Sequence, residues 1–160
     1  MIDVTKAAGG NETLVLELVR AMETGDLPEV VKSVCTEGFV WANSGLAVIN
    51  GQAELFEQMA RGGFAAQIPI LKTMTHFSAE LIHIASKGDI VFTERVDHHW
   101  DEQGRDLMTP HICGVAEIRE GRISAFRDFY DVACYNQAPT EVQGGYDLAS
   151  FREAQLNGTK

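Results

Sequence analysis

The sequence contains few cysteines, no long apolar run and no excess of basic residues. Its three cysteines lie far apart and form no CxxC pair, which is typical of reduced thiols rather than of a disulfide framework. No apolar run is long enough for a membrane-spanning helix, and residues 1–10 lack the apolar segment of a secretory signal. These absences predict a cytoplasmic protein with no membrane partner.

The shortage of basic side chains also disfavours nucleic acid as a partner. Lysine and arginine together number 13 against 23 aspartates and glutamates, for a formal net charge of -10. Nucleic acids and anionic membranes both select basic patches. With 160 residues and 45% hydrophobic composition, the chain is long enough to bury one core. We expect a single domain over 1–160, with an extension at 1–10, a core at 11–135 and a tail at 136–160.

Helical periodicity dominates the first third of the chain. Residues 11–24 form an amphipathic pattern that Asn11 can cap. Asp26 then begins a capping-box pattern, with Pro28 in the first turn of a helix that reaches about Cys35. The segments predicted to follow are a strand over 39–43, a returning strand over 46–50 and a helix over 52–61.

From Thr73 onward the pattern changes to that of long strands joined by glycine-containing turns. Beyond residue 133 the only periodic segment is a candidate helix over 147–155. An antiparallel sheet must bury one face, and the N-terminal helices are the available cover. We therefore expect an α+β fold, with a strongly curved antiparallel or mixed sheet wrapped around its helices and a cone-shaped cavity. The predicted strands are 74–85, 90–100, 107–118 and 122–132.

Polar side chains fall on single faces of three predicted strands, because strand residues two apart point the same way. If these faces look into the cavity, two carboxylates and a guanidinium converge there. Burial raises the pKa of an aspartate, while a guanidinium lowers it, so the pair can hold one neutral acid beside one anion. Such a site must be dry; the alternative is an ion pair on a solvated face. The residues concerned are Trp41, Asn43, Arg95, Asp97 and Asp128.

The same residues lie in motifs that resemble the limonene-1,2-epoxide hydrolase family. The resemblance covers roughly residues 11–135, and its motifs occur on separate strands in the family's order. The segment over 39–43 is similar to the family's first strand, where a Tyr-x-Asn motif is usual and this chain has Trp41 and Asn43. The other matching segments are Thr93-Glu94-Arg95-Val96-Asp97, Gly114-Val115, Glu120-Gly121-Arg122-Ile123 and Phe126-Arg127-Asp128-Phe129-Tyr130-Asp131.

This resemblance implies an enzyme that opens a small-molecule epoxide with water in one step, giving a vicinal diol. Asp128 would be the general base acting on a water held by Asn43, and Asp97 the general acid. Arg95 would bridge the two carboxylates, and Trp41 would stand where the family has a tyrosine that positions the water. No metal or organic cofactor is implied. The family is typically dimeric, and its fold is the cone-shaped one of nuclear transport factor 2 and ketosteroid isomerase.

The resemblance also predicts a pocket wall around the polar cluster. His99 falls where the family usually has an apolar residue, which favours a substrate other than a plain terpene epoxide. The alternative interpretation is a histidine that lies at the pocket rim and hydrogen-bonds water. Cys113 is expected to be a buried, inert thiol. The predicted wall residues are His99, Pro110, Ile112, Phe126 and Tyr130.

Two other functions compete with this interpretation. A ketosteroid isomerase or polyketide cyclase of the same fold would use Asp97 or Asp128 to abstract a carbon-bound proton. A non-catalytic binding module is the alternative from a different class, and an Arg95 that faces solvent would favour it. A metal site is disfavoured, because the adjacent His98 and His99 point to opposite faces of one strand.

Overall fold

The computed structural model describes residues 1–136, so the candidate helix over 147–155 and nearly all of the expected tail lie outside the described residues. Within these residues the order of helices and strands agrees with the prediction except for one interrupted strand, and four short 3-10 helices lie between or beside them. The 3-10 helices are Val4–Lys6, Gly63–Ala66, Pro69–Thr73 and Val132–Tyr135. The longer elements are α1 (Gly10–Thr24), α2 (Leu27–Val34), β1 (Cys35–Asn43), β2 (Ile49–Asn50), α3 (Gly51–Ala60), β3 (Met74–Lys87), β4 (Ile90–Asp101), β5 (Asp106–Met108), β6 (His111–Arg119) and β7 (Arg122–Phe129).

The helices begin and end for local reasons, which differ in part from the predicted ones. Helix α1 starts at Gly10 after Gly9, and Asn11 donates instead to the Gly88 carbonyl at 3.2 Å, so the predicted Asn11 cap is wrong. Asp26 precedes α2 as predicted but makes no side-chain cap. Between them Gly25 takes a left-handed conformation with φ 84°, which glycine adopts without a steric penalty.

Within the described residues the strands form one mixed sheet. Its order is β2-β1-β7-β6-β4-β3, and β5 pairs with β4. All pairs are antiparallel except β1 with β7, which run parallel with Asn43 opposite Asp128 and Trp41 opposite Phe126. This one parallel pairing brings the first predicted strand beside the last, and with it the two halves of the site.

The predicted strand over 107–118 is interrupted, so this expectation is corrected. It forms two strands, β5 and β6, separated by Thr109 and Pro110. Proline has no N–H to donate to a strand ladder, and the Pro110 carbonyl instead accepts from the Asp97 N–H at 3.1 Å. The break turns Pro110 and Ile112 toward the same interior as Asp97. The last strand also ends earlier than predicted, at Phe129 rather than 132.

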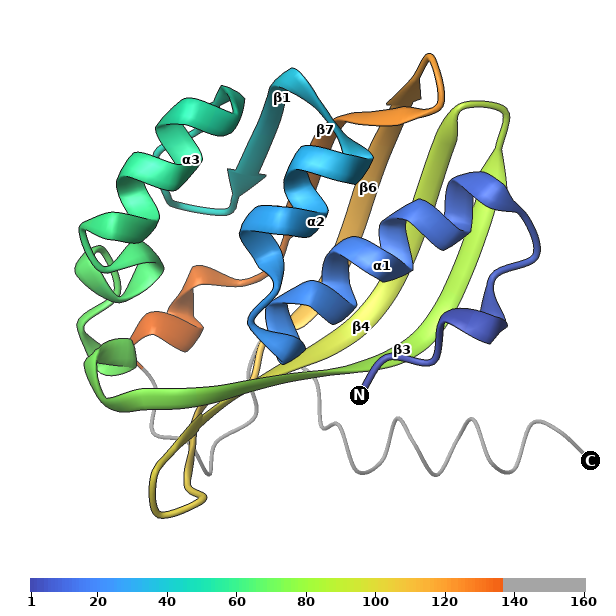
Figure 1. Ribbon diagram of the computed structural model, residues 1–160. Helices are drawn as coiled ribbons and strands as arrows, with labels where there is room; N and C mark the ends of the chain where they lie inside the picture. The colour runs from blue at the N-terminus through green and yellow to red at the C-terminus, as the bar shows by residue number, and fades with distance from the viewer. Residues whose placement is uncertain (137–160) are drawn as a thin grey trace, which may run out of the picture.

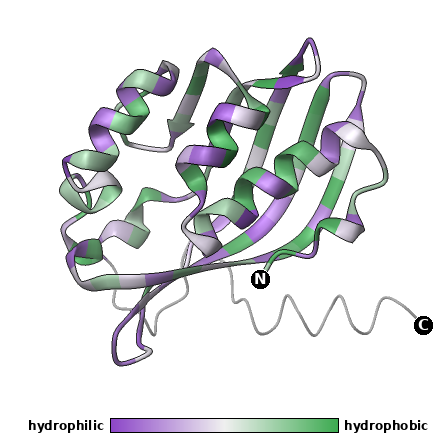
Figure 2. Ribbon diagram, viewed as in Figure 1, coloured by the Kyte–Doolittle hydropathy of each residue, from purple (hydrophilic) through white to green (hydrophobic). Residues whose placement is uncertain are grey.

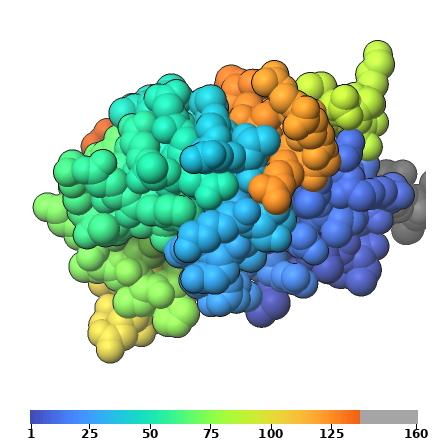
Figure 3. Space-filling view, turned by 45° about the horizontal axis from the view of Figure 1, so that its top comes forward, coloured from blue at the N-terminus to red at the C-terminus, as the bar shows by residue number. Residues whose placement is uncertain are grey.

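The helices cover one face of the sheet, which confirms the predicted α+β arrangement. Figure 1 shows α1 and α2 lying across the sheet, with α3 over its β1 edge. Their apolar sides face inward in Figure 2, and α1 buries Val15, Leu16, Leu18 and Val19 completely. Figure 3 shows α2 and α3 adjacent on the surface that covers this core. None of the described helices is long and apolar enough to cross a membrane.

Candidate active site

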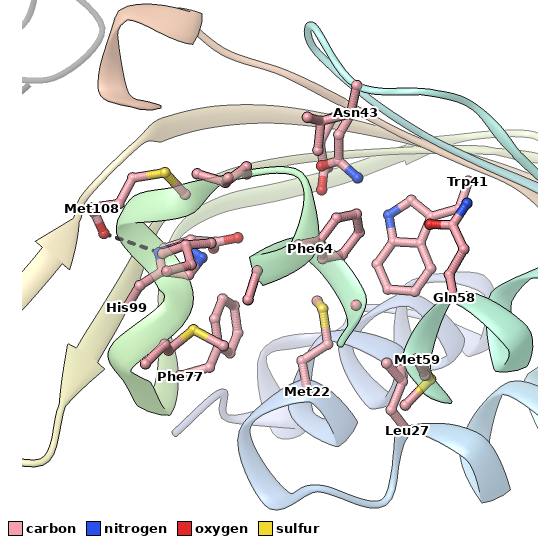
Figure 4. A pocket seen from close by; sticks show the side chains of 18 of the residues that line it. Met22, Leu27, Trp41, Asn43, Gln58, Met59, Phe64, Phe77, His99 and Met108 are labelled. Carbon is pink, nitrogen blue, oxygen red and sulfur yellow. Dashed lines mark hydrogen bonds between the residues drawn. The ribbon is translucent and has the colours of Figure 1, made fainter. Parts of the chain in front are cut away.

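A cavity of about 480 Å³ opens between the helices and the sheet. Its walls come from the α1–α2 junction, α3 and the 3-10 segment after it, and the inner faces of β1, β4, β6 and β7 (Figure 4). Most of the lining is aliphatic, aromatic or methionine side chains, as expected of a pocket for an apolar ligand. The predicted site residues on this lining are Trp41, Asn43, Asp97, His99, Pro110, Ile112, Asp128 and Tyr130.

Arg95 lies directly beneath the polar part of the cavity wall and joins its two carboxylates. Its side chain is completely buried. Nε donates to Asp97 Oδ1 at 2.9 Å, and Nη2 donates to Asp128 Oδ2 at 2.5 Å. Nη1 donates to Thr93 Oγ1 at 3.3 Å. The guanidinium therefore holds both aspartates through separate nitrogens, which sets the position and orientation of each carboxylate.

This bridge spans three strands, because Arg95 lies on β4 and Asp128 lies on β7 with β6 between them. Two strand spacings amount to about 10 Å, so the guanidinium must pass over the backbone of β6. It does so at Gly114, which is paired with Thr93 on one side and Asp128 on the other. A Cβ added there would lie 2.7 Å from Arg95 Nη1 and 2.4 Å from Thr93 Oγ1. The absence of a side chain at Gly114 thus makes room for the guanidinium.

Aromatic packing supports the bridge from below. The guanidinium carbon of Arg95 lies 5.4 Å from the centre of the Phe126 ring, and the same ring packs edge-on against Trp41 at 5.8 Å. Phe126 is fully buried and is not among the residues that line the cavity. The sequence analysis placed Phe126 in the pocket wall; the structure places it one layer deeper, where the inward face of β7 meets the core.

Burial is the dominant influence on the titration of both aspartates. Desolvation raises the pKa of Asp97 and of Asp128, and the positive charge of Arg95 acts in the opposite direction on each. The pKa of Asp128 is raised further by the proximity of Asp97. One guanidinium balances only one carboxylate, so a buried pair of anions would leave an uncompensated charge. This arrangement favours a single proton on the carboxylate pair.

Two buried polar atoms at the site lack a hydrogen-bond partner among the described residues. They are Asp128 Oδ1, an acceptor, and Trp41 Nε1, a donor. Buried polar atoms are rarely left unpaired, because desolvation without a new bond is costly. Asn43 is opposite Asp128 in the β1–β7 register, and Figure 4 shows the Trp41 indole and the Asn43 amide along one wall. A small molecule that both donates and accepts, such as water, fits this donor and acceptor set.

A chain of hydroxyls holds the Asn43 amide from behind. Tyr135 donates from its hydroxyl to the Ser44 carbonyl at 2.6 Å, and the Tyr130 and Tyr135 hydroxyls lie 2.7 Å apart. Since a carbonyl only accepts, the proton of Tyr135 is used there and Tyr130 donates to Tyr135. The 3.4 Å contact between Tyr130 and Asn43 Oδ1 then has no proton available, whereas a rotated amide would donate to Tyr130 from Nδ2. In the structure Oδ1 of Asn43 faces the Tyr130 hydroxyl; rotating the amide by half a turn would present Oδ1 to the cavity as an acceptor.

The surroundings of Cys113 contradict one further sequence expectation. Cys113 is exposed on the outer face of β6 rather than buried, because Gly114 and not Cys113 takes the inward position. Within residues 1–136 no group of three or more histidine, cysteine or carboxylate side chains could hold a metal ion. His99 lines the cavity, whereas His98 pairs with Asp106 at 2.5 Å.

The comparisons with known proteins identify the family of the chain. A family model described as the limonene-1,2-epoxide hydrolase catalytic domain matches residues 10–138, which is most of the chain. The chain belongs to the limonene-1,2-epoxide hydrolase family. Membership confirms the resemblance found in the sequence and identifies the chain as an enzyme of the epoxide hydrolase type.

Solved structures show the wider fold of this family member. A limonene-1,2-epoxide hydrolase-like epoxide hydrolase from M. tuberculosis superimposes with a TM-score of 0.62 at 23% identity, over 79% of this chain and 86% of that one. A protein from Jannaschia sp. CCS1 described as a SnoaL-like polyketide cyclase gives 0.64 at 13% identity, over 83% and 93%. A protein with a ketosteroid isomerase-like fold from Catenulispora acidiphila gives 0.60 at 14%, over 76% and 88%. At these identities the likeness establishes an NTF2-like fold.

Two residues that contribute to the site are not predicted by strand periodicity. Gly114 was noted only as part of a motif, although a glycine in the middle of a long strand signals a close approach. Tyr135 lies beyond the last strand, where no periodicity predicts its direction. It reaches the site only because the chain turns back through the 3-10 helix Val132–Tyr135.

Replacing Gly114 by alanine tests the path of the guanidinium. We expect Gly114→Ala to lower the free energy of unfolding by about 1–3 kcal/mol, since the added methyl overfills a buried site, and to reduce turnover by displacing Arg95. Denaturant unfolding and epoxide hydrolysis measure the two effects. Gly38→Ala is the matched control, because Gly38 is also a strand glycine and its added Cβ would meet nothing within 4 Å. If the two variants have the same unfolding free energy and the same turnover, a methyl group fits at Gly114 without displacing Arg95.

Proposed function

We propose that this enzyme adds water to a hydrophobic cyclic epoxide in a single step, giving a vicinal diol, with Asp97 and Asp128 as acid and base. The observation that carries the proposal is the Asp97–Arg95–Asp128 bridge, which is buried and lies at the wall of a largely apolar cavity. We take this cavity to be the deep substrate pocket of a curved, cone-shaped sheet.

Asp128 is the general base in this proposal. Arg95 occupies its Oδ2, which leaves Oδ1 as the atom that accepts a proton from water. Asn43, directly across the β1–β7 pair, accepts the second water proton through Oδ1 once its amide is rotated so that Nδ2 donates to Tyr130. Trp41 Nε1 donates to the water oxygen in place of the family's tyrosine hydroxyl. Together these groups direct one lone pair of the water toward the cavity.

Asp97 is the general acid. Its Oδ1 is held by Arg95, and its side chain lines the cavity, so Oδ2 is the oxygen that carries the proton toward an oxirane. Burial raises the pKa of Asp97, as a carboxylic acid that must remain protonated near neutral pH requires. Proton donation matters here because the ring-opening alkoxide is a poor leaving group.

Charges and atoms balance through the step. The water oxygen bonds to one oxirane carbon as the bond from that carbon to the ring oxygen breaks. Asp128 gains a proton from the water while Asp97 gives its proton to the ring oxygen. The pair ends with its protonation states exchanged and its net charge unchanged, so Arg95 remains balanced throughout. A proton must return from Asp128 to Asp97 before the next turnover.

The remaining expectations are part of the same proposal. By family resemblance we propose that no metal or organic cofactor takes part and that the enzyme is a homodimer of single-domain subunits, and the sparse, unpaired cysteines support a cytoplasmic location. An Arg95 that faced solvent would have favoured the binding-module alternative, but Arg95 is completely buried. The isomerase alternative uses the same carboxylates, and it would be favoured if Asn43 and Arg95 proved unable to hold a water.

Removing either carboxylate should abolish most of the turnover. We expect Asp128→Asn and Asp97→Asn each to lose about 100- to 10,000-fold in kcat, the range for a positioned acid or base. Diol formation from limonene oxide and cyclohexene oxide provides the measurement. Glu117→Gln is the matched control, because Glu117 pairs with Arg127 at 2.5 Å on the same sheet but outside the cavity. An asparagine variant as active as this control would remove that aspartate from the mechanism.

The pH dependence of kcat/KM should be bell-shaped, because turnover needs one proton on the carboxylate pair. Activity falls on the acid side when Asp128 is protonated and on the alkaline side when Asp97 loses its proton. Burial raises the pKa of both groups, so the acid limb lies above the ordinary aspartate value of 3.8. Rates from about pH 4 to about pH 10, corrected for uncatalysed opening, test this. A profile without an alkaline limb would contradict the role of Asp97 as acid.

Substitutions of Trp41 test the donor to the water. Trp41→Tyr should keep or raise activity, since a phenol hydroxyl also donates. Trp41→Phe, which keeps an aromatic ring without a donor, should lower kcat roughly tenfold, the effect of losing about one hydrogen bond. Thermal unfolding of both variants separates this loss from a packing defect. If Trp41→Phe and Trp41→Tyr have the same kcat, the indole nitrogen takes no part in holding the water.

A further inference from the structure

His99 differs from the other polar residues of the cavity because no acid–base role uses it. It lies on β4 two residues after Asp97, lines the same cavity and packs its ring edge-on against Phe77 at 5.3 Å. The surrounding wall is largely apolar, and several of its members are methionine or phenylalanine. A polar ring in such a wall is costly unless each of its nitrogens finds a partner.

The hydrogen bond at one nitrogen defines the chemistry of the other. His99 Nδ1 lies 2.9 Å from the Met108 carbonyl oxygen. A carbonyl can only accept, so Nδ1 carries the proton of the ring. Burial lowers the pKa of His99 to about 4, which keeps the ring neutral. Nε2 is therefore an acceptor with a lone pair and no proton.

This acceptor is directed at the ligand. Figure 4 shows the Nε2 edge of the His99 ring turned away from Met108 and toward the cavity interior. Among the described residues no group donates a hydrogen bond to Nε2. A hydrocarbon bound against it would leave the acceptor unpaired, while a second acceptor such as a carboxylate would be repelled. Only a hydrogen-bond donor on the ligand satisfies this position.

The strand geometry places the donor relative to the reacting ring. Residues two apart on a strand lie about 7 Å apart on the same face, so His99 is that far from the acid Asp97 along β4. A ligand whose oxirane oxygen meets Asp97 would place a donor group at roughly this distance from it. Cyclic skeletons of about ten carbon atoms with a side chain span such a length.

We propose that His99 is a specificity residue whose Nε2 accepts a hydrogen bond from a substrate hydroxyl, so that the preferred substrates are hydroxylated hydrophobic epoxides. This inference rests on the proposed epoxide hydrolysis and names its substrate class. A hydroxyl supplies the donor without a charge, which an enclosed apolar wall accommodates best. The preference comes from the site's own unpaired acceptor, because a site built to bond a hydroxyl discriminates against the analogue that lacks it.

Two epoxides with one carbon skeleton test the proposal. Limonene 1,2-oxide carries no hydroxyl, whereas the 1,2-oxide of α-terpineol carries one on the side chain remote from the oxirane. We expect the wild-type enzyme to favour the hydroxylated epoxide in kcat/KM by roughly tenfold, the worth of one hydrogen bond. His99→Phe, which keeps a ring beside Phe77 without an acceptor, should remove that preference. His99→Gln should restore it, since its amide can donate to the Met108 carbonyl and present an oxygen to the cavity.

The outcomes separate this proposal from the reaction itself. Equal kcat/KM for the two epoxides in the wild type, or a preference that persists in His99→Phe, overturns the role of His99 while leaving the hydrolysis intact. If the folded wild type opens neither epoxide, the proposed reaction fails, and the acceptor is tested by calorimetric binding of α-terpineol and limonene instead. Tighter binding of the alcohol that disappears in His99→Phe supports the inference; equal binding of the two refutes it.

Discussion

The buried guanidinium of Arg95 is the constraint on which the rest of this structure depends. Removing such a group from water is costly unless every donor finds an acceptor, and a fully buried arginine must be paired. Here the pairing requires two carboxylates from different strands, a hydroxyl from Thr93 and a strand without a side chain at Gly114. Phe126 covers the remaining face. The registers of β4, β6 and β7 are thereby tied to one another through a single side chain.

Burial of the Asp97–Arg95–Asp128 cluster costs desolvation free energy, and the same burial gives the cluster its acid–base properties. In water both aspartates would be anions at neutral pH, and neither could donate a proton. In the cavity wall desolvation raises the pKa of each, while one positive charge is available to balance one negative charge. A coupled pair with a single proton supplies an acid and a base side by side. The free-energy cost of burying these charges is offset by apolar packing elsewhere in the protein. Here the helices α1 and α2 provide that packing.

Polar atoms without a hydrogen-bond partner in the protein indicate the positions in the cavity that suit a ligand or water. Asp128 Oδ1 and Trp41 Nε1 are buried and unpaired among the described residues, and they belong to the same wall as Asn43. His99 is only part-buried, and its Nε2 is a third atom with no partner among the described residues, an acceptor because Nδ1 donates to the Met108 carbonyl. The first two atoms suit a water molecule, which donates and accepts, and the third suits a donor only. In our proposal the apolar wall between them separates the reacting end of the substrate from the end that His99 binds.

The sequence by itself determined what depends on neighbours along the chain. Alternation on a strand placed Arg95, Asp97 and His99 on one face, and motif order indicated the family. Only the tertiary structure decided the parallel pairing of β1 with β7, which sets Asn43 beside Asp128, and the break at Pro110, the deeper position of Phe126 and the proton direction at His99. These features depend on contacts between residues distant in sequence or on which carbonyl lies against a nitrogen. Strand periodicity is local, whereas register and hydrogen-bond partners emerge when the whole sheet packs.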